Sequence, residues 1–233
     1  MKRIAFYGGS FDPPHVGHLT IARKLIDLFA LDEFVFIPAF HAPHKKDRKP
    51  TSAFHRFAML AIAANNDPKI KVSTIELDAP EKPFTVETQA RLKNELPDAE
   101  IFFVIGADSW LEITTWREWE SVLTLTNIIV VTRPDYKIEF SHVTEEIRSR
   151  VVDLRNSGQS SVVGGRLKSK DQKPKTEERR PKTKDLNIYI TDAVNLDVSA
   201  TEIRREIQDN ENGWREFVPD GVANYIKKYE LYI

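Results

Sequence analysis

The chain contains no cysteine among its 233 residues. It can therefore form no disulfide framework, zinc–thiolate site, iron–sulfur cluster or catalytic thiolate, and its stability is independent of the redox state of its compartment. The mean hydropathy is -0.41, and no stretch approaches the ~20 consecutive apolar residues that a transmembrane helix needs. We therefore expect neither a disulfide-stapled fold nor a membrane span.

A secretion signal and a large net charge are missing as well. The first residues, Met-Lys-Arg, lead directly into a strand-like run, without the apolar core of about 7–15 residues and the cleavage site of a signal peptide. The 34 basic and 35 acidic side chains leave a formal net charge of -1. Such a chain has no overall attraction for nucleic acid or anionic lipid. We expect a cytoplasmic protein that binds small molecules and no membrane.

Apolar runs of strand length alternate with segments of helical period along almost the whole chain. This alternation is typical of an α/β fold with a mostly parallel sheet and helices on both faces. A chain of this length can bury roughly 70% of its unfolded surface, so we expect one domain over residues 1–233. The expected strands lie near 3–8, 34–38, 71–76, 101–106, 127–132 and 187–191, and the expected helices near 17–29, 53–65, 85–96, 118–124, 142–155, 199–210 and 219–229.

Residues 164–184 interrupt this pattern. They contain nine Lys or Arg, three Asp or Glu, two Pro and one large aliphatic residue, Leu167. A segment of this composition cannot bury enough apolar surface to offset its ordering entropy. We interpret it as a mobile basic surface loop inserted into the domain, with a patch that attracts polyphosphate or RNA as the alternative.

The first strand-like run leads into a turn rich in glycine and proline. A glycine-containing turn between a strand and a helix places backbone N–H groups where α/β proteins bind phosphate. His15 and His18 lie on one face of the helix entrance, and each can donate an N–H to a phosphate. The spacing matches neither a P-loop nor a dinucleotide fingerprint. The stretch is Gly8-Gly9-Ser10-Phe11-Asp12-Pro13-Pro14-His15-Val16-Gly17-His18.

A second candidate phosphate site lies at residues 198–204, Val-Ser-Ala-Thr-Glu-Ile-Arg. Ser199 followed by Glu202 is by itself a capping box that opens a helix. Arg204 adds a cation one turn into that helix. Together with the hydroxyls of Ser199 and Thr201 and the helix N–H groups, it could hold the β- and γ-phosphates of a triphosphate.

Four further segments carry candidate binding residues. Asp108, in Gly106-Ala107-Asp108-Ser109, follows an apolar strand and could hold ribose hydroxyls, with a helix N-cap as the alternative role. Residues 82–85 open a helix at Thr85. Residues 114–117 place Trp116 beside a cation, and residues 38–45 end in Pro-His-Lys.

These motifs together resemble the nicotinate mononucleotide adenylyltransferase family of the nucleotidyltransferase superfamily. The first matches the superfamily signature (H/T)-x-G-H, and the second matches I-S-S/A-T-x-I-R, with Val198 in place of the usual isoleucine. The segments G-A-D-S, K-P-F-T, T-T-W-R and P-H-K and the closing pattern from Pro219 to Tyr232 are similar to those of this family. The resemblance covers nearly the whole chain except residues 164–184, and it implies a Rossmann-like nucleotidyltransferase fold.

The resemblance also implies a reaction and a set of site residues. The reaction joins ATP and nicotinate mononucleotide to give nicotinate adenine dinucleotide and pyrophosphate, a late step of NAD biosynthesis, by direct in-line attack on the α-phosphate. Mg²⁺ would arrive with ATP, and no protein-bound metal is expected, because the histidines lack carboxylates at ligand spacing. The resemblance implies that His15, His18 and Arg204 are catalytic. The residues that it implies for ATP binding are Gly8, Gly9, Ser10, Phe11, His18, Gly106, Asp108, Ser199, Thr201 and Arg204. For binding of the mononucleotide it implies Lys45, Phe84, Thr85, Trp116 and Arg117, with His41, His44 and Arg133 as further candidate site residues.

Some residues depart from the family pattern. Phe84 replaces a frequent tyrosine and so removes a hydroxyl, and Asp135 replaces a glycine after Arg133, whose role is a phosphate contact or a structural salt bridge. Two alternative functions stay open. One is another small-molecule adenylyltransferase, such as pantetheine-phosphate adenylyltransferase, and the other is a nucleic-acid-binding module that uses residues 164–184. A homo-oligomer is compatible with the sequence.

Overall fold

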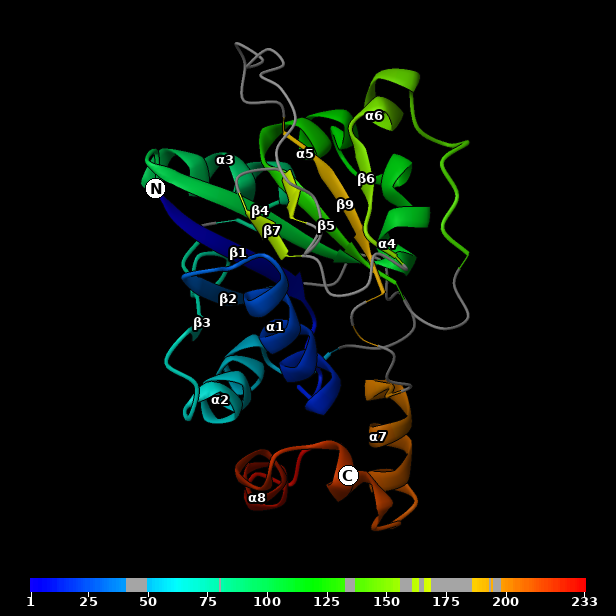
Figure 1. Ribbon diagram of the computed structural model, residues 1–233. Coiled ribbons are helices and arrows are strands. Elements are labelled where there is room, and N and C mark those ends of the chain that lie inside the picture. The colour runs from blue at the N-terminus through cyan, green and yellow to red at the C-terminus, as the bar shows by residue number, and fades with distance from the viewer. Residues whose placement is uncertain are drawn as a thin grey trace.

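The computed structural model describes residues 1–40, 50–79, 81–132, 137–155, 161–163, 166–168, 186–192, 194 and 198–233 (Figure 1). A seven-stranded sheet forms its centre, in the order β3-β2-β1-β4-β5-β9-β6, and each neighbouring pair of strands is parallel. Helices cover both faces, which confirms the predicted α/β, Rossmann-like class. The strands are β1 Lys2–Gly9, β2 Glu33–Pro38, β3 Ile70–Val72, β4 Ala99–Gly106, β5 Asn127–Val131, β6 Val151–Asp153 and β9 Ile188–Thr191.

Successive residues of the central strands face two separate apolar cores. In β1, Ala5 and Tyr7 pack with helix α1 in one core, whereas Ile4 and Phe6 belong to the other core, with residues of α3 and α5. This alternation follows from the period of two along a strand. Because both faces are covered, the strands are nearly continuous apolar runs, as in IAFY and IFFVI.

The long predicted helices are confirmed to within one or two residues at their ends. The α-helices are α1 Val16–Leu28, α2 Ala53–Ala64, α3 Thr85–Glu95, α4 Ala107–Leu111, α5 Trp119–Leu125, α6 Glu145–Ser149, α7 Ala200–Gln208 and α8 Asp220–Lys228, with 3₁₀ turns at Ile113–Thr115 and Gly213–Phe217. No helix in the described ranges is long and apolar enough to cross a membrane.

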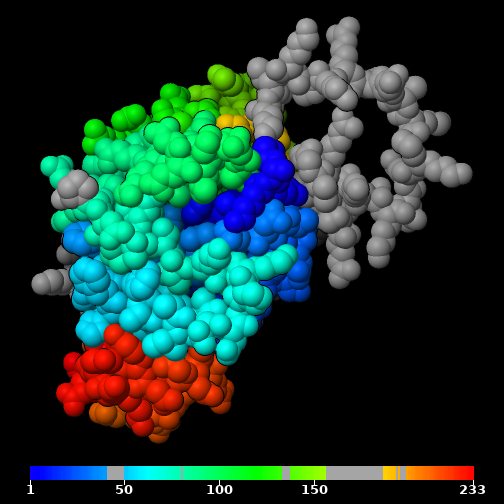
Figure 2. Space-filling model, turned by 90° about the vertical axis from the view of Figure 1, so that its left-hand side faces the viewer, coloured from blue at the N-terminus to red at the C-terminus, as the bar shows by residue number. Residues whose placement is uncertain are grey.

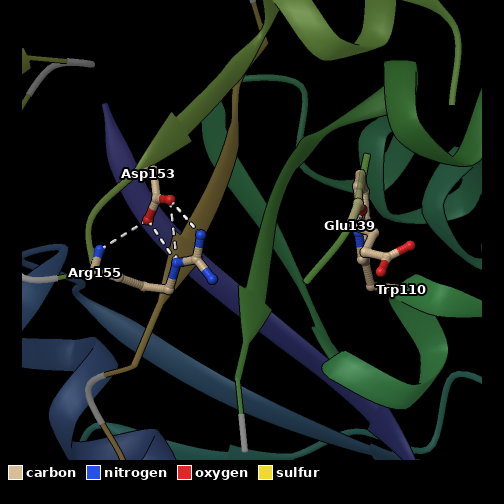
Figure 3. Close-up of polar contacts among 4 residues, drawn as sticks. All are labelled: Trp110, Glu139, Asp153 and Arg155. Atoms are coloured by element: carbon tan, nitrogen blue, oxygen red, sulfur yellow. Dashed lines mark hydrogen bonds and ion pairs between the residues drawn. The ribbon is translucent and has the colours of Figure 1, made fainter. Parts of the chain in front are cut away.

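The predicted helix over residues 142–155 is wrong. Thr144 caps the short helix α6 by accepting a hydrogen bond from the backbone N–H of Ile147, and the chain then forms β6, which pairs with β9 at the sheet edge. Just past β6, Arg155 donates to both carboxylate oxygens of Asp153, at 2.6–3.1 Å (Figure 3). The apolar residues of this segment have a helical spacing, but the helix ends at Ser149 and the chain then pairs with β9 as a strand.

The region after β6 is only partly described. The strands β7 Ser161–Val163 and β8 Arg166–Lys168 form an antiparallel pair. The segment 164–184, expected to be a loop, therefore contains a short strand at residues 166–168. Residues 164–165 and 169–184 lie outside the described residues.

The carboxyl-terminal helices pack against α2. The helices α7 and α8 and the turn between them share an apolar core with Met59 of α2, built around Trp214, Val222 and Ile226. Figure 2 shows this carboxyl-terminal segment, in orange and red, directly against the cyan part of the chain that contains α2. The end of the chain is thereby brought close to the loop that follows β1.

Candidate active site

The sheet order determines where a ligand can bind. From β1 the chain proceeds outward through β2 and β3, and then crosses to the other side of β1 to form β4. Parallel sheets bind ligands at such a reversal, beyond the carboxyl ends of the strands. A cavity of about 490 Å³ lies at this position, lined by Gly8 and Gly9 at the end of β1 and by Gly106 at the end of β4.

The cavity is lined by every described residue that the sequence proposed for the site. These are the residue predicted to be catalytic alone, His15; those predicted for ATP, Gly8, Gly9, Ser10, Phe11, His18, Gly106, Asp108, Ser199, Thr201 and Arg204; and those predicted for the mononucleotide, Phe84, Thr85, Trp116 and Arg117. These residues come from segments almost two hundred positions apart in the chain. The sequence motifs do not by themselves require these segments to meet, so their position around one cavity is a separate observation.

Two glycines, at the end of β1 and in the first turn of α1, allow close packing on either side of the turn between these elements. A Cβ on Gly9 would lie 2.9 Å from the ring of Phe11, and a Cβ on Gly17 would lie 3.0 Å from the ring of His15. Both glycines therefore allow a ring to lie directly on the backbone. Phe11 itself has a φ of 49°, a left-handed conformation that is uncommon for a residue with a side chain.

His15 and His18 form a stacked pair at the start of α1. Their ring centroids are 3.7 Å apart at an interplanar angle of 30°. The backbone N–H of His15 donates to Nδ1 of His18, at 3.2 Å, so a neutral His18 carries its proton on Nε2. Both side chains are largely buried, yet both line the cavity. The pair, together with the amino-terminal end of α1, suits an anion.

Arg204 connects the second motif to the first. Its Nη1 donates to the backbone carbonyl of Asp12 at 2.5 Å, and its Nη2 donates to the hydroxyl of Thr201 at 3.1 Å. Ser199 is the N-cap of α7 and accepts from the N–H of Thr201, at 3.2 Å. Ser199 therefore opens the helix as predicted, with the N–H of Thr201 rather than that of Glu202 as its donor.

Asp108 is not the N-cap that the sequence left open as an alternative. Gly106 occupies the N-cap position of α4, and Asp108 lies in the first turn. A Cβ on Gly106 would lie 2.4 Å from Oδ1 of Asp108. The glycine therefore makes room for the carboxylate to fold back over the end of β4, at the edge of the cavity.

Aromatic and cationic side chains also line the cavity. The guanidinium of Arg117 lies over the ring of Phe84, 4.7 Å from its centroid, and weaker ion pairs connect it to Glu87 and Glu118, at 3.7 and 3.6 Å. Trp116 packs partly on the core and also lines the cavity. Thr85 is the first residue of α3, as predicted.

Arg56 is a buried residue of the site that the sequence did not reveal. It is 1% exposed, and its guanidinium donates to the backbone carbonyls of Thr51, Ser10 and Ala39, at 2.9, 2.6 and 2.6 Å. Burial lowers its pKa, an effect opposed by the negative charge of Asp12. Arg56 thus anchors both the turn after β1 and the segment after β2. The sole sequence signal was a cation within an apolar helix.

Glu76 is a second such residue. It lines the cavity and accepts a hydrogen bond from the hydroxyl of Thr88, at 3.2 Å. Burial raises its pKa to about 7, although hydrogen bonds from Thr88 and from the backbone of Phe40 and the charge of Arg56 act in the opposite direction. The cavity therefore contains a carboxyl group that titrates near neutral pH.

Several predicted residues cannot be placed. His41, His44 and Lys45, and also Arg133, lie outside the described residues, and so does Asp135. His55 forms a hydrogen bond with the hydroxyl of Tyr225, at 2.9 Å, and His142 forms one with the backbone carbonyl of Trp110, at 3.0 Å. The indole N–H of Trp110 in turn donates to the backbone carbonyl of Glu139 (Figure 3). Within the described part of the chain, no group of three or more histidine and carboxylate side chains could hold a metal ion.

Comparison with known proteins decides the family. The model of the cytidylyltransferase-like family matches residues 6–206. The protein named "Probable nicotinate-nucleotide adenylyltransferase" of Desulfatibacillum aliphaticivorans is 33% identical over 99% of this chain and 100% of its own length. The chain belongs to the nicotinate-nucleotide adenylyltransferase family. A family member of the same name from Citrifermentans bemidjiense is also 33% identical, over 99% of this chain and 98% of its own length.

A solved structure agrees with the family assignment at the level of fold. The nicotinic acid mononucleotide adenylyltransferase of Plasmodium falciparum, complexed with NaAD, has a TM-score of 0.70 and 22% identity, covering 100% of this chain and 98% of that chain. The sheet and its surrounding helices are therefore those of the family.

Proposed function

We propose that this member of the family joins ATP and nicotinate mononucleotide, releasing pyrophosphate and forming nicotinate adenine dinucleotide for NAD biosynthesis. The observation that carries the proposal is the cavity at the strand reversal. Its lining includes the His15–His18 pair, the amino-terminal end of α7 and the aromatic residues Phe84 and Trp116. Pyrophosphate release from ATP and nicotinate mononucleotide tests it directly.

The reaction needs positioning and charge stabilisation more than a nucleophilic side chain. A phosphate oxygen of the mononucleotide attacks the α-phosphorus of ATP in line, the new P–O bond forms, and the bond to the leaving pyrophosphate breaks. Nε2–H of His18 donates to a non-bridging oxygen of the α-phosphate, where charge develops. His15, stacked on His18, stabilises the bridging oxygen of the leaving group.

The leaving pyrophosphate is held at the start of α7. Ser199, Thr201 and Arg204 surround a helix amino terminus, which favours negative charge. Mg²⁺ arrives with ATP, as part of the substrate, and neutralises phosphate oxygens, since this ion prefers phosphate and water ligands. Lys45, which lies outside the described residues, is proposed from the family resemblance to neutralise phosphate charge of the mononucleotide.

The two ends of the dinucleotide product are held by different residues. Asp108 accepts hydrogen bonds from the hydroxyls of the adenosine ribose. At the other end, the indole of Trp116 stacks on the pyridine ring. The backbone N–H groups at Thr85 and Arg117 bind the pyridine carboxylate, and the nearby guanidinium of Arg117 favours the acid over the neutral amide.

Trp116→Ala is expected to weaken nicotinate mononucleotide binding by about 1–3 kcal/mol, as for the loss of other stacked aromatic side chains. ATP affinity should stay almost unchanged, because the adenosine site lies at the other end of the cavity. The measurement is KM for each substrate in a pyrophosphate-release assay, with Trp119→Ala as the matched control. Trp119 also packs on the core and does not line the cavity.

An equal loss for both substrates, accompanied by the same fall in Tm as in Trp119→Ala, would contradict this role. It would show that Trp116 supports the core and does not bind the pyridine.

A further inference from the structure

The last residues of the chain reach the phosphate-binding turn that follows β1. The hydroxyl of Tyr232 donates a hydrogen bond to Oδ1 of Asp12, at 2.7 Å, between residues 220 positions apart in the sequence. Both side chains are 6% exposed. Asp12 lines the cavity and stands three residues before His15. This contact joins the carboxyl terminus to the proposed catalytic histidines.

Three elements converge on Asp12. Its Oδ2 accepts from the backbone N–H of Thr51 at 3.3 Å, and its backbone carbonyl accepts from Arg204. Arg56 contributes a positive charge close to Asp12 and Tyr232. Asp12 thus has a buried side chain, and its backbone carbonyl contacts the same guanidinium that is proposed to hold the triphosphate.

Backbone strain lies at both ends of the Tyr232–Asp12 contact. Tyr232 has a φ of 70°, and Phe11, the residue before Asp12, has a φ of 49°. Each such conformation is unfavourable for a residue with a side chain and persists only where its surroundings enforce it. The closing segment is therefore held in an unfavourable conformation that places a hydroxyl on Asp12.

The hydroxyl of Tyr232 is a permanent donor. Burial, followed by the negative charge of Asp12, raises the pKa of Tyr232 far above its usual range. The phenol therefore keeps its proton at neutral pH and remains a hydrogen-bond donor to Asp12.

We propose that Tyr232 is a positioning residue for ATP, which holds the Asp12 carboxylate away from Arg204 and fixes the turn that carries His15 and His18. If the hydroxyl is lost, the buried carboxylate keeps the N–H of Thr51 and needs another donor. Arg204 lines the cavity and already donates to the backbone carbonyl of Asp12, so the Asp12 carboxylate would then compete with the phosphates for it. This inference rests on the proposed function for ATP and for the role of Arg204 in holding its phosphates, and it does not depend on the identity of the second substrate.

The test compares Tyr232→Phe with Tyr225→Phe. The first keeps the buried ring and removes the hydroxyl. The control removes a hydroxyl that contacts His55, away from the cavity. We expect Tyr232→Phe to lower kcat/KM for ATP about tenfold, the effect of a lost hydrogen bond to a charged group, and to change KM for the mononucleotide less than about twofold. Tyr225→Phe should leave both unchanged.

A double-mutant cycle with Asp12→Asn separates positioning from general stability. If Tyr232 acts through Asp12, Tyr232→Phe should have little further effect on kcat/KM for ATP in the Asp12→Asn background, because the competing anion is already gone. Additive effects would overturn the proposal. It would also be overturned if Tyr232→Phe lowered Tm while leaving kcat/KM for ATP at the wild-type value.

Calorimetric titration with a methylene analogue of ATP measures nucleotide binding alone, so its result does not depend on the second substrate. Weaker analogue binding by Tyr232→Phe, with wild-type binding by Tyr225→Phe, supports the proposal even if nicotinate mononucleotide proves not to be a substrate. Equal binding by wild type and Tyr232→Phe contradicts it.

Discussion

Substitution of His18 by alanine is expected to lower kcat by about 10²–10³-fold, the usual cost of removing one preorganised donor from a transition state. The His18 ring is fixed by stacking on His15, by the edge of Phe11 at a centroid distance of 4.9 Å and by the backbone N–H of His15. This support leaves Nε2 as the donor to the α-phosphate. KM for ATP should rise far less, because the charge on the α-phosphate grows in the transition state.

The measurement is steady-state pyrophosphate release, with His142→Ala as the control. His142 binds the carbonyl of Trp110 and does not line the cavity. Near-normal turnover by His18→Ala would remove His18 from the catalytic residues. So would a loss of turnover that matched the fraction of unfolded protein.

Replacement of Arg56 by methionine should have the largest effect on stability, lowering the free energy of unfolding by about 3–5 kcal/mol. Arg56 donates side-chain hydrogen bonds to three backbone carbonyls, and Met leaves these carbonyls without those donors in a buried region. The same change leaves Asp12 without the positive charge of Arg56. Chemical denaturation at neutral pH measures this loss.

Arg23→Met is the control for Arg56→Met. Arg23 makes a more exposed ion pair with Asp67, at 3.5 Å, and such pairs contribute about 0–1 kcal/mol. Similar losses in both variants would show that Arg56 is not an anchor of the two loops.

The residues proposed to bind phosphate could be selected from the sequence because their signal is local. His15 and His18 lie one turn apart behind a glycine turn, and Ser199, Thr201 and Arg204 lie within six residues. Each group is fixed by backbone geometry of one short segment. A parallel sheet then brings both segments to its carboxyl edge, since each follows a strand in the chain.

The buried polar contacts could not be predicted, because they join distant segments. The pairing of Tyr232 with Asp12 and the placement of Arg56 between two loops depend on how α2, α7 and α8 pack. Hydrophobic spacing indicates which face of a helix is buried and does not identify the carbonyl that a buried cation reaches.

The incorrect helix over 142–155 has a similar cause. Val143, Ile147 and Val151 are spaced by four, which is a helical period. Val151 nevertheless belongs to β6, whose pairing partner β9 lies more than thirty residues later in the chain. Residues 151–153 form an edge strand because β9 is available to pair with them. The local sequence of these residues does not by itself indicate a strand.

The cavity at the strand reversal is proposed to be where the adenylyl group of ATP is transferred to nicotinate mononucleotide. The most direct measurement is pyrophosphate release by the purified chain with ATP and Mg²⁺ against nicotinate mononucleotide, nicotinamide mononucleotide and phosphopantetheine. We expect the highest kcat/KM with nicotinate mononucleotide, a lower value with the amide and no turnover of phosphopantetheine. If phosphopantetheine alone were turned over, or if no pyrophosphate were released with any of the three acceptors, the chain would not catalyse this reaction.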